Sequence, residues 1–455
     1  MSSVLEPDAS APAPWVAAYR ASDVEITQAV TAPLLRNPGK VWWLAVLLSA
    51  PFMAWFMAAL GWVFYRGIGV WGVNSTIVWG VAIADYVWWI GIGNAGTLIS
   101  AMLLLTRQRW RASINRFAEA MTLFAVAIAG LMPIVHLGRP IYAYWLAPYP
   151  NTMSLWPQWR SALVWDFWAI VSYLLFSILF WYVSLIPDLA TMRDRTLSRT
   201  GQLLYGAFAL GWCGSVRQWR AMKILHTTMA ALGVPLVCSV HSIVGLDFAA
   251  SLMPGWQESI FPPYFVVGAM YSGFAMVVVL ALAIRWGFQL QAIITRKHLD
   301  VIARVLLMSS IVMGYSYATE WFMGWYGGAR SDRSLVAFEF AGTYAPLFWA
   351  LLGCNVVLPQ ALWFPRVRRS LVALFAIAVA INVGMWLERI LIVWNTLSHG
   401  YMPSLWRSFH FTIWDLAFVI APLGFFAFLF LMFVRLIPAI SMFDMRELTH
   451  RENVA

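Results

Sequence analysis

Two aspartates stand out because each lies inside a long apolar stretch. Asp166 occurs in LVWDFWA and Asp247 in HSIVGLDFAAS, and neither is near a plausible helix-cap position. An ionisable side chain inside a membrane is costly and usually has a function. His136, in PIVHLGRP, ends another apolar stretch. One histidine and two carboxyls in a pocket of low dielectric could accept the protons that a quinol releases together with its two electrons.

Aromatic side chains beside Asp166 suit the same chemistry. Trp165, Phe167 and Trp168 are its neighbours in the sequence, and aromatic rings of this kind can stack on a flat ligand. The residues that we expect to act on a quinol are therefore His136 and Asp166 as proton acceptors, with Trp165 among the contacts to the ring.

No metal centre is expected in this chain. Its three cysteines are scattered without a CxxC motif, which excludes an iron–sulfur cluster or an attached c-type haem of its own. His226 and His241 fall on one predicted helix, about 22 Å apart by helical rise, so they cannot share a haem. Only His136 with His241 remains as an outer pair. Electrons taken from a ligand would have to leave through another subunit.

Further ionisable residues fall within the predicted helices: Asp85, Glu119, His226, Glu320, Glu339, Glu388, Arg389 and Asp415. The candidates for a proton path are Asp85, Glu119, His226 and Glu320. Glu339 and Asp415 lie close to predicted helix starts, where a carboxylate favours the helix dipole, so we interpret both as structural.

Arg389 needs a carboxylate partner if it is buried. Its neighbour Glu388 points about 100° away around the helix, so only one of the two is expected to face the interior. Asp166 and Asp247 are predicted to lie at the same depth and are the best candidates for that partner.

The composition indicates that these residues lie in a membrane. Of 455 residues, 62% are hydrophobic and only 11% are charged, with 28 Trp, 29 Phe and 16 Tyr. Soluble domains carry about 25% charged residues, and disordered chains are poor in aromatic ones. The apolar stretches exceed the ~18 residues of a spanning helix and lack the alternation of barrel strands. The chain is therefore predicted to be an all-α integral membrane protein.

Ten spanning helices are predicted, at 42–65, 76–106, 115–136, 160–186, 221–250, 262–293, 299–324, 335–362, 370–396 and 411–437. They form a membrane domain over 42–437, between an N-terminal segment at 1–41 and a C-terminal tail at 438–455. One set of loops carries sixteen Lys and Arg, and the alternate set carries six. Because Lys and Arg collect in cytoplasmic loops, this bias places both termini in the cytoplasm. It also accounts for the net charge of +10 without a nucleic-acid partner.

Two outer loops have a different character. Residues 137–160 and 251–264 are rich in Trp, Tyr and Pro and nearly uncharged. They could form an aromatic belt at the membrane surface, or a docking surface for an extracytoplasmic subunit. Both interpretations are compatible with the sequence.

Several long blocks resemble the NrfD-like family, the polysulfide-reductase-type membrane subunits. They are VWWIGIGNAGTLISAMLLL, WRASINRFAEAMTLFAVAIAGLMPIVHLGRP, WPQWRSALVWDFWAI, FWYVSLIPDLATMRD, HSIVGLDFAASLMPGW and IFPPYFVVGAMYSGFAMV. Within that family the chain is similar to the quinol-oxidising membrane subunits of bacterial alternative complex III. The later GYSYATEWFMGWY and MWLERILIVW are compatible with it, so the resemblance extends over essentially all spans.

The resemblance implies two four-helix bundles, helices 2–5 (about 76–250) and 6–9 (about 262–396), flanked by helices 1 and 10. It implies a quinol pocket at the extracytoplasmic end of the first bundle, built by His136, Asp166, Asp247 and Arg389. Menaquinol and ubiquinol stay open.

The same resemblance implies a set of partners in the bacterial inner membrane. They are an iron–sulfur subunit docked on the extracytoplasmic face, c-type haem subunits, a second NrfD-like subunit, lipids and, as a further candidate, cytochrome c oxidase. One departure concerns Asn94 in GIGNAGT, where relatives often carry His. Because Asn does not titrate near pH 7, a proton-relay role at Asn94 is doubtful. Proton translocation by the chain is compatible with the sequence but not required by it.

Three alternatives remain open. The chain could be the membrane quinone subunit of a molybdenum oxidoreductase such as polysulfide reductase. It could be a secondary transporter, since pseudo-repeated bundles and midplane acids occur there too, although parallel repeats and few broken helices argue against this. It could also be an anchor without a quinol site, which the cluster of outer acids argues against.

Overall fold

The computed structural model describes Trp15, residues 22–146 and residues 154–454, and all regular elements within these ranges are helical. The α-helices are α1 (Asp23–Leu35), α2 (Lys40–Arg66), α3 (Val81–Leu105), α4 (Asn115–His136), α5 (Ala162–Arg195), α6 (Arg199–Phe208), α7 (Val216–Ala249), α8 (Phe261–Gly287), α9 (Arg296–Tyr326), α10 (Arg330–Ala341), α11 (Ala345–Leu352), α12 (Pro365–Arg369), α13 (Leu371–Ser398), α14 (Ile413–Leu436) and α15 (Met442–Val454). Short turns of helix are η1 (Ile68–Val70), η2 (Arg109–Ser113), η3 (Pro140–Leu146), η4 (Gly353–Val357), η5 (Leu358–Trp363) and η6 (Pro403–Leu405). Residues 1–14 and 16–21 of the predicted N-terminal segment, and residues 147–153 of the predicted outer loop, lie outside the described residues.

Ten helical segments in the described ranges are long and apolar enough to cross a membrane. Their positions agree with the ten predicted spans to within a few residues at most ends, because long apolar runs determine where a spanning helix can lie. This confirms the all-α, multi-span prediction. Apart from the eighth span, the largest shifts are at the end of α5, which continues to Arg195, and at the end of α8, which stops at Gly287.

The eighth span corrects the prediction. A single helix was expected over 335–362, but α10 ends at Ala341 and a new helix begins at Ala345, so the spanning segment is Ala345–Trp363. Pro346 in the first turn of α11 cannot continue a preceding helix, since it lacks the backbone N–H. Glu339, which was assigned to the span, therefore lies in α10, outside it.

Helix α3 is at the centre of the molecule. It contacts α4, α7, α8 and α13, and its residues from Val81 to Ala101 are all buried. Small residues allow this close packing. A Cβ at Gly96 would lie 2.0 Å from the Ala118 carbonyl oxygen of α4, and a Cβ at Gly273 of α8 would lie 1.8 Å from the Cβ of Ala95. Neither position has room for a larger side chain.

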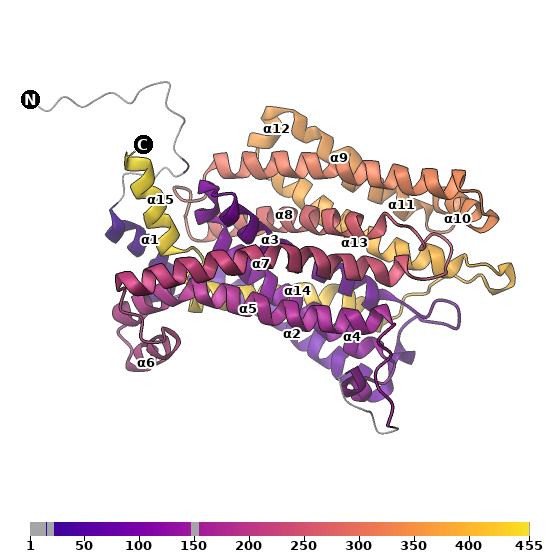
Figure 1. Cartoon of the computed structure of the whole chain (residues 1–455), viewed down its shortest axis with the longest axis horizontal. Helices are drawn as coiled ribbons and strands as arrows, with labels where there is room; N and C mark the ends of the chain where they lie inside the picture. Colours follow the sequence, from indigo (N-terminus) through magenta and orange to yellow (C-terminus); the bar gives the residue numbers. More distant parts are fainter. Residues whose placement is uncertain (1–14, 16–21, 147–153, 455) are drawn as a thin grey trace, which may run out of the picture.

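The remaining long helices fall into two groups and one pair. Helices α4 and α7 pack against α3, and α5 packs against α4 and α7. Helices α9 and α13 pack against α8, α11 packs against α13, and α2 pairs with α14 (Figure 1). We name α3, α4, α5 and α7 the first bundle, and α8, α9, α11 and α13 the second bundle. The predicted division into two bundles is compatible with these contacts and stays a prediction.

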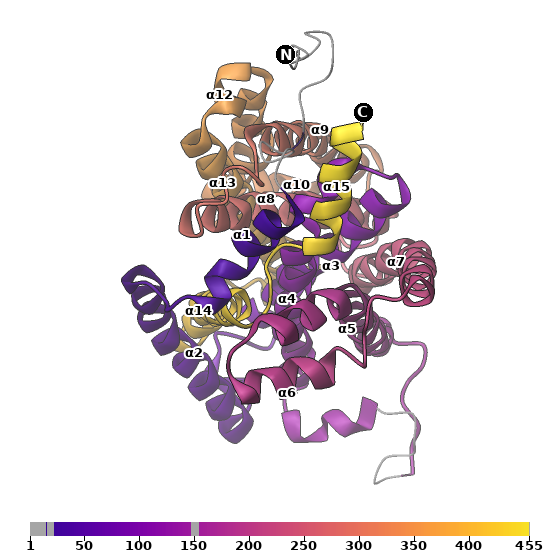
Figure 2. The ribbon, with the colours of Figure 1, turned by 90° about the vertical axis from the view of Figure 1, so that its left-hand side faces the viewer.

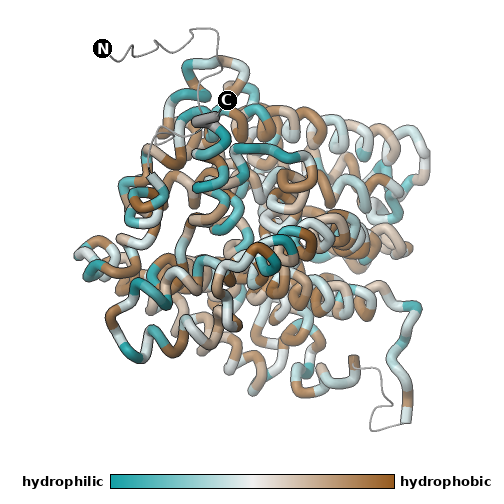
Figure 3. The backbone as a smooth tube through the Cα atoms, turned by 60° about the vertical axis from the view of Figure 1, so that its left-hand side comes forward, coloured by the Kyte–Doolittle hydropathy of each residue, from teal (hydrophilic) through white to brown (hydrophobic). Residues whose placement is uncertain are grey.

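The two ends of the first bundle are named by what they carry. The inner end carries α1, α15 and η2, which lie together in Figure 2 and contact one another as α1 with α15 and α15 with η2. The hydrophilic residues of α15 appear as a teal segment in Figure 3, in contrast to the browner long helices. The outer end carries the last turns of α4 and α7 and the first turn of α5. The assignment of the inner end to the cytoplasm rests on the loop charges and stays a prediction.

Asp415 has the structural role that was predicted for it. It lies in the first turn of α14 in a capping box with Thr412, and its side chain also accepts a hydrogen bond of 2.8 Å from the backbone N–H of Gly72. A carboxylate at this position satisfies donors at the helix start and favours the helix dipole.

Candidate functional site

The structure brings Asp166 and Asp247 together at the outer end of the first bundle. Asp166 lies one turn into α5 and Asp247 in the last turn of α7, and the two carboxyls interact with each other and with the hydroxyl of Tyr86 on α3. Asp166 and Tyr86 are almost fully buried, and Asp247 is half-buried. We name these three residues the outer acid cluster.

The outer acid cluster has unused hydrogen-bonding capacity. The three groups lie close enough to interact, but Asp166 Oδ1, Asp247 Oδ1 and the Tyr86 hydroxyl form no hydrogen bond of good geometry with any described residue. Buried polar atoms of this kind are usually satisfied, so a group of three orphans points to a ligand or to an exchangeable proton. Sequence reasoning missed Tyr86, since nothing in its apolar surroundings distinguishes it from a core tyrosine.

His136 lies at the same end of the first bundle as the outer acid cluster, and it packs against aromatic rings. It is the last residue of α4, and its ring lies edge-on to Trp79, with centroids 5.8 Å apart. Trp79 in turn stacks on Trp256 at 5.3 Å and contacts Phe248, the neighbour of Asp247. We name Trp79, Phe248 and Trp256 the aromatic cluster. Trp79 was not predicted as a site residue, because it lies in the loop before α3 and outside the sequence blocks that resemble the family.

Trp165 lies apart from these groups. Its side chain is 37% exposed, whereas Asp166 is 2% exposed, so the two residues lie on different faces of α5. The indole nitrogen of Trp165 donates a hydrogen bond of 2.6 Å to the carbonyl of Trp159. Trp168, three residues on, has an indole nitrogen that no described residue accepts from. The contact of Trp165 with a ring ligand therefore stays a prediction.

The predicted partner of Arg389 was wrong. Both Glu388 and Arg389 are buried, and they form an ion pair with each other at 2.8 Å. The 100° offset between neighbours on a helix did not separate them, because the long arginine side chain can bend back to the adjacent carboxylate. The guanidinium also lies over the Phe265 ring at 4.1 Å. A Cβ at Gly268 would lie 2.7 Å from Arg389 Nη2, so glycine makes room for it.

Glu388 and Arg389 belong to the second bundle. The hydroxyl of Tyr317 donates to Glu388, and the amide of Asn355 donates to that hydroxyl at 2.9 Å. Because Phe265 contacts Phe248 at 5.6 Å, aromatic side chains connect Arg389 to the aromatic cluster.

The four residues predicted for a proton path do not form one group. Asp85 accepts a hydrogen bond of 2.6 Å from the indole of Trp386 between the bundles. Glu320 lies in the second bundle, within electrostatic range of Glu339 and Glu388. Only Glu119 and His226 lie at the inner end of the first bundle.

Polar side chains do run along the first bundle between its two ends. Asn94, Thr97 and Ser100 are spaced by three residues on α3, so they share one face. Asn94 pairs with Nδ1 of His241. Below this pair the backbone N–H of Thr97 donates to the Thr122 hydroxyl at 3.0 Å, and Ser100 donates to Glu119. Sequence reasoning considered His241 only as a possible haem ligand and missed its pairing with Asn94, which lies 147 positions away.

Two carboxylates at the inner end, Asp188 and Asp444, have cationic partners. Arg116 forms a buried ion pair of 2.9 Å with Asp188, and Arg111 forms one of 2.7 Å with Asp444 of α15. Burial opposes ionisation of Asp444, but Arg111 and a hydrogen bond of 2.9 Å from Asn115 hold its pKa below the usual range.

Metal ligation is not a feature of the described residues. Within them there is no group of three or more His, Cys, Asp or Glu side chains that could hold a metal ion. The chemistry available at the outer end is proton exchange by carboxyl, hydroxyl and imidazole groups beside flat aromatic rings.

Comparison with known proteins finds a matching protein family and relatives that are named as reductase subunits. The family model described as "Polysulphide reductase, NrfD" matches residues 69–398. The chain is 24% identical over 241 residues to a "Putative dimethyl sulfoxide reductase membrane subunit" of Halobacterium salinarum, a match over 53% of this chain and 51% of the relative. It is 21% identical over 328 residues to a selenate reductase subunit of Mesobacillus selenatarsenatis, over 70% of this chain and 74% of the relative.

The chain thus spans about half the length of the halobacterial relative. The family match covers most of the chain, including eight of the ten spanning segments found in the described residues, each of them in whole. This protein belongs to the NrfD polysulphide reductase family.

Proposed function

We propose that this chain is the quinol-oxidising membrane subunit of a respiratory oxidoreductase complex, and that quinol reacts at the outer end of the first bundle. The observation that carries the proposal is the outer acid cluster, with three buried polar atoms that no described residue satisfies. The aromatic cluster next to it suits the flat ring of a quinol.

The proposed chemistry is proton acceptance. A quinol gives up two protons and two electrons to become a quinone. Asp166 accepts one proton from a quinol hydroxyl, and His136 accepts the other on its way to the outer surface. Asp247, beside Asp166, stays protonated when Asp166 is ionised, since two carboxylates in contact do not both ionise readily. Arg389 was predicted for this pocket, but it is paired with Glu388 and lies over the Phe265 ring, so its charge is not available to balance Asp166 or Asp247.

The electrons leave through a partner subunit. We propose an iron–sulfur subunit docked on the outer face, where exposed Trp156 and Trp159 stand on the loop before α5. In the assembly that the sequence resembles, alternative complex III, the further partners are c-type haem subunits, a second NrfD-like subunit and, as a candidate, cytochrome c oxidase. The membrane is the bacterial inner membrane.

A second assembly is a molybdenum oxidoreductase that takes its electrons from the same quinol site. The names of the two relatives, a dimethyl sulfoxide reductase subunit and a selenate reductase subunit, favour it. Purification of the native complex separates the two assemblies. A pyridine haemochrome spectrum of c-type haem supports alternative complex III, and stoichiometric molybdenum without haem supports the molybdenum enzyme.

Proton translocation is a further part of the proposal. The polar side chains of α3 from Asn94 to Ser100 lie between the outer acid cluster and Glu119, and Ser184 donates to Glu119 at 3.3 Å. His226 lies beside the inner cavity, where water could reach it. This supports Glu119 and His226 as inner candidates, with Asp85 and Glu320 on separate routes.

Photolabelling tests the site directly. The purified complex is illuminated with an azidoquinone, and the labelled peptides are mapped by mass spectrometry. We expect label on the segments that carry Trp79, His136, Asp166 and Asp247, and we expect quinol to compete it away. Label confined to the second bundle, or label that quinol does not displace, would overturn the proposed site.

A further inference from the structure

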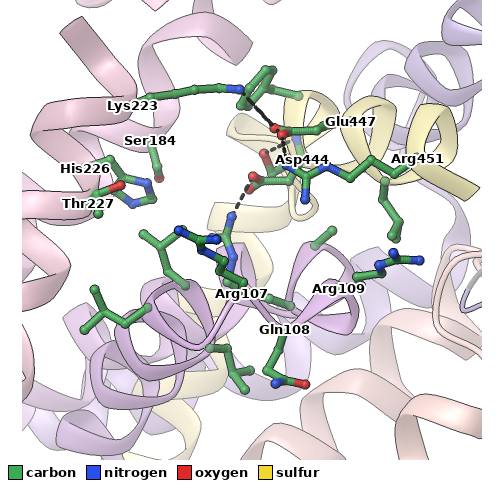
Figure 4. Close-up of a pocket in the computed structure, with 18 of the residues that line it drawn as sticks. Arg107, Gln108, Arg109, Ser184, Lys223, His226, Thr227, Asp444, Glu447 and Arg451 are labelled. Carbon is green, nitrogen blue, oxygen red and sulfur yellow. Dashed lines mark hydrogen bonds and ion pairs between the residues drawn. The ribbon is translucent and has the colours of Figure 1, made fainter. Parts of the chain in front are cut away.

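An open cavity of about 490 Å³ lies at the inner end of the first bundle (Figure 4). Its walls are the end of α3 with the following turn, the first half of α7, Ser184 of α5 and one side of α15. None of the outer-site residues lines it. The described carboxylates that line it, Asp444 and Glu447, are both on α15.

The charge around the cavity is unbalanced. Five basic residues line it, against two acidic ones: Arg107, Arg109, Arg111, Lys223 and Arg451 against Asp444 and Glu447. Asp444 pairs with Arg111, and Glu447 lies 2.5 Å from Arg451 and 3.5 Å from Lys223. Arg107 and Arg109 form no ion pair with any acidic residue in the described part of the chain. The cavity therefore offers two free cations to an anion.

A nearly buried histidine also lines the cavity. His226 on α7 is 8% exposed, and within the described ranges no residue pairs with its Nε2. Figure 4 shows its ring beside Thr227 and Ser184 on the wall of the cavity. A neutral imidazole with Nε2 protonated can donate a hydrogen bond to a phosphate oxygen.

The apolar side of the cavity continues toward the lipid. Leu103, Leu104 and Leu105 line the wall at the end of α3, and Leu105 is 39% exposed. Leu225 on α7, next to His226, is 49% exposed. Acyl chains could lie along these side chains while a headgroup occupies the cavity.

We propose that this cavity binds the phosphate of an anionic phospholipid headgroup. Arg107 and Arg109 supply the charge, His226 supplies a hydrogen bond, and Leu103 to Leu105 receive the acyl chains. Basic pockets between helices on the cytoplasmic side of a membrane are suited to anionic headgroups. The proposal is independent of quinol chemistry, since neither arginine belongs to the outer site.

Native mass spectrometry of the purified, delipidated complex tests the proposal. The probes are phosphatidylglycerol, phosphatidylcholine with the same acyl chains, and inorganic phosphate. The test variant is Arg107→Gln/Arg109→Gln. The matched control is Arg217→Gln, an exposed arginine in the first turn of α7 that does not line the cavity. A second variant, Arg107→Lys/Arg109→Lys, keeps the charge and controls for damage to the fold.

We expect wild type, the lysine variant and Arg217→Gln to bind phosphatidylglycerol at least tenfold more tightly than phosphatidylcholine. In the double glutamine variant this preference falls to about twofold or less, with unchanged complex assembly. A double glutamine variant that keeps the full preference would overturn the proposal. Inorganic phosphate that binds alone, or that displaces the lipid at equal concentration, would show a free-anion site and would also overturn it.

Discussion

The outer and inner ends of the first bundle both bury carboxylates, but they treat them differently. At the inner end, Asp188 and Asp444 each lie within 3 Å of an arginine. At the outer end, Asp166 and Asp247 lie beside each other and beside Tyr86, with no cation of the described chain in an ion pair with either. Two carboxyls in contact without a cation cost free energy unless one holds a proton.

The difference separates structure from chemistry. Ion pairs at the inner end attach α15 and η2 to the bundle and can persist unchanged through a reaction cycle. The unpaired acids at the outer end are suited to exchange protons with a substrate. Glu388 and Arg389 of the second bundle resemble the inner end in this respect, since the arginine is already neutralised. We therefore expect substitutions at the inner end to lower the stability of the protein, and substitutions at the outer end to impair the reaction with quinol.

The largest effect on stability is expected from Arg116→Gln. It leaves Asp188 buried without its cation, because both side chains are at most 2% exposed in the ion pair. Removal of one partner of such a pair costs about 3–5 kcal/mol. Unfolding of the purified protein in mixed micelles should show this loss, and Arg116→Leu/Asp188→Leu should recover much of it.

The matched control is Arg193→Gln. Arg193 pairs with Asp194 at 2.7 Å, but their side chains are 31% and 63% exposed. A pair open to solvent contributes less than about 1 kcal/mol. If both variants lost equal stability, the inner pair would have no special structural role.

A smaller effect is expected from Trp79→Leu at the outer end. Trp79 contacts both His136 and Trp256, the latter within the aromatic cluster. The loss of an aromatic contact costs about 1 kcal/mol. We expect KM for quinol to rise about tenfold, equivalent to about 1.4 kcal/mol, with little change in unfolding. Steady-state kinetics measures this change.

Trp62→Leu is the control for Trp79→Leu. Trp62 is 38% exposed and stacks on Trp414 at 5.5 Å, away from the outer acid cluster. Its loss should leave KM unchanged. Equal changes in KM for both variants would remove the aromatic cluster from the proposed site.

The smallest effect is a dependence on pH at the inner end. The pKa of Asp444 is lower in the folded protein than its ordinary value, despite burial, because of Arg111 and Asn115. Asp444 therefore stabilises the docked α15 above the unfolded-state pKa, and this stabilisation is lost as pH falls through the folded-state value. The protection factors of the α15 amides, which correct exchange rates for the pH dependence of intrinsic exchange, should stay constant from about pH 8 to 5 and decrease below about pH 4.

The variant Asp444→Asn tests whether this acid dependence belongs to Asp444 or to a neighbouring group. The variant should exchange faster at neutral pH and lose most of the acid dependence. An acid dependence as steep as that of wild type would assign the transition to another group.

Much of the fold could be predicted from the sequence. Apolar run length is a local property, and it gave nine spans close to their final bounds. The eighth failed because hydropathy alone does not register the stop at Gly342 and the restart at Pro346, where the backbone rather than the polarity changes.

The candidate site could be predicted only as a set of residues. The depths of His136, Asp166 and Asp247 followed from helical rise, but side-chain partners did not. The indole of Trp386 bonds Asp85 across 301 positions of sequence, and Arg111 bonds Asp444 across 333. Such pairs depend on rotamers and on the packing of helices that are far apart in the chain, and the choice of Glu388 as the partner of Arg389 depends on the same factors.

Quinol:acceptor turnover of the intact complex, wild type against Asp166→Asn, tests the central claim most directly. Asparagine nearly matches aspartate in shape but does not accept the proton, so kcat should fall about 10²–10⁴-fold. Unfolding and the amounts of the partner subunits should be unchanged, because the carboxylate has no cationic partner to lose. Full turnover in an assembled Asp166→Asn complex would remove Asp166 from the mechanism and contradict the assignment of quinol oxidation to the outer end.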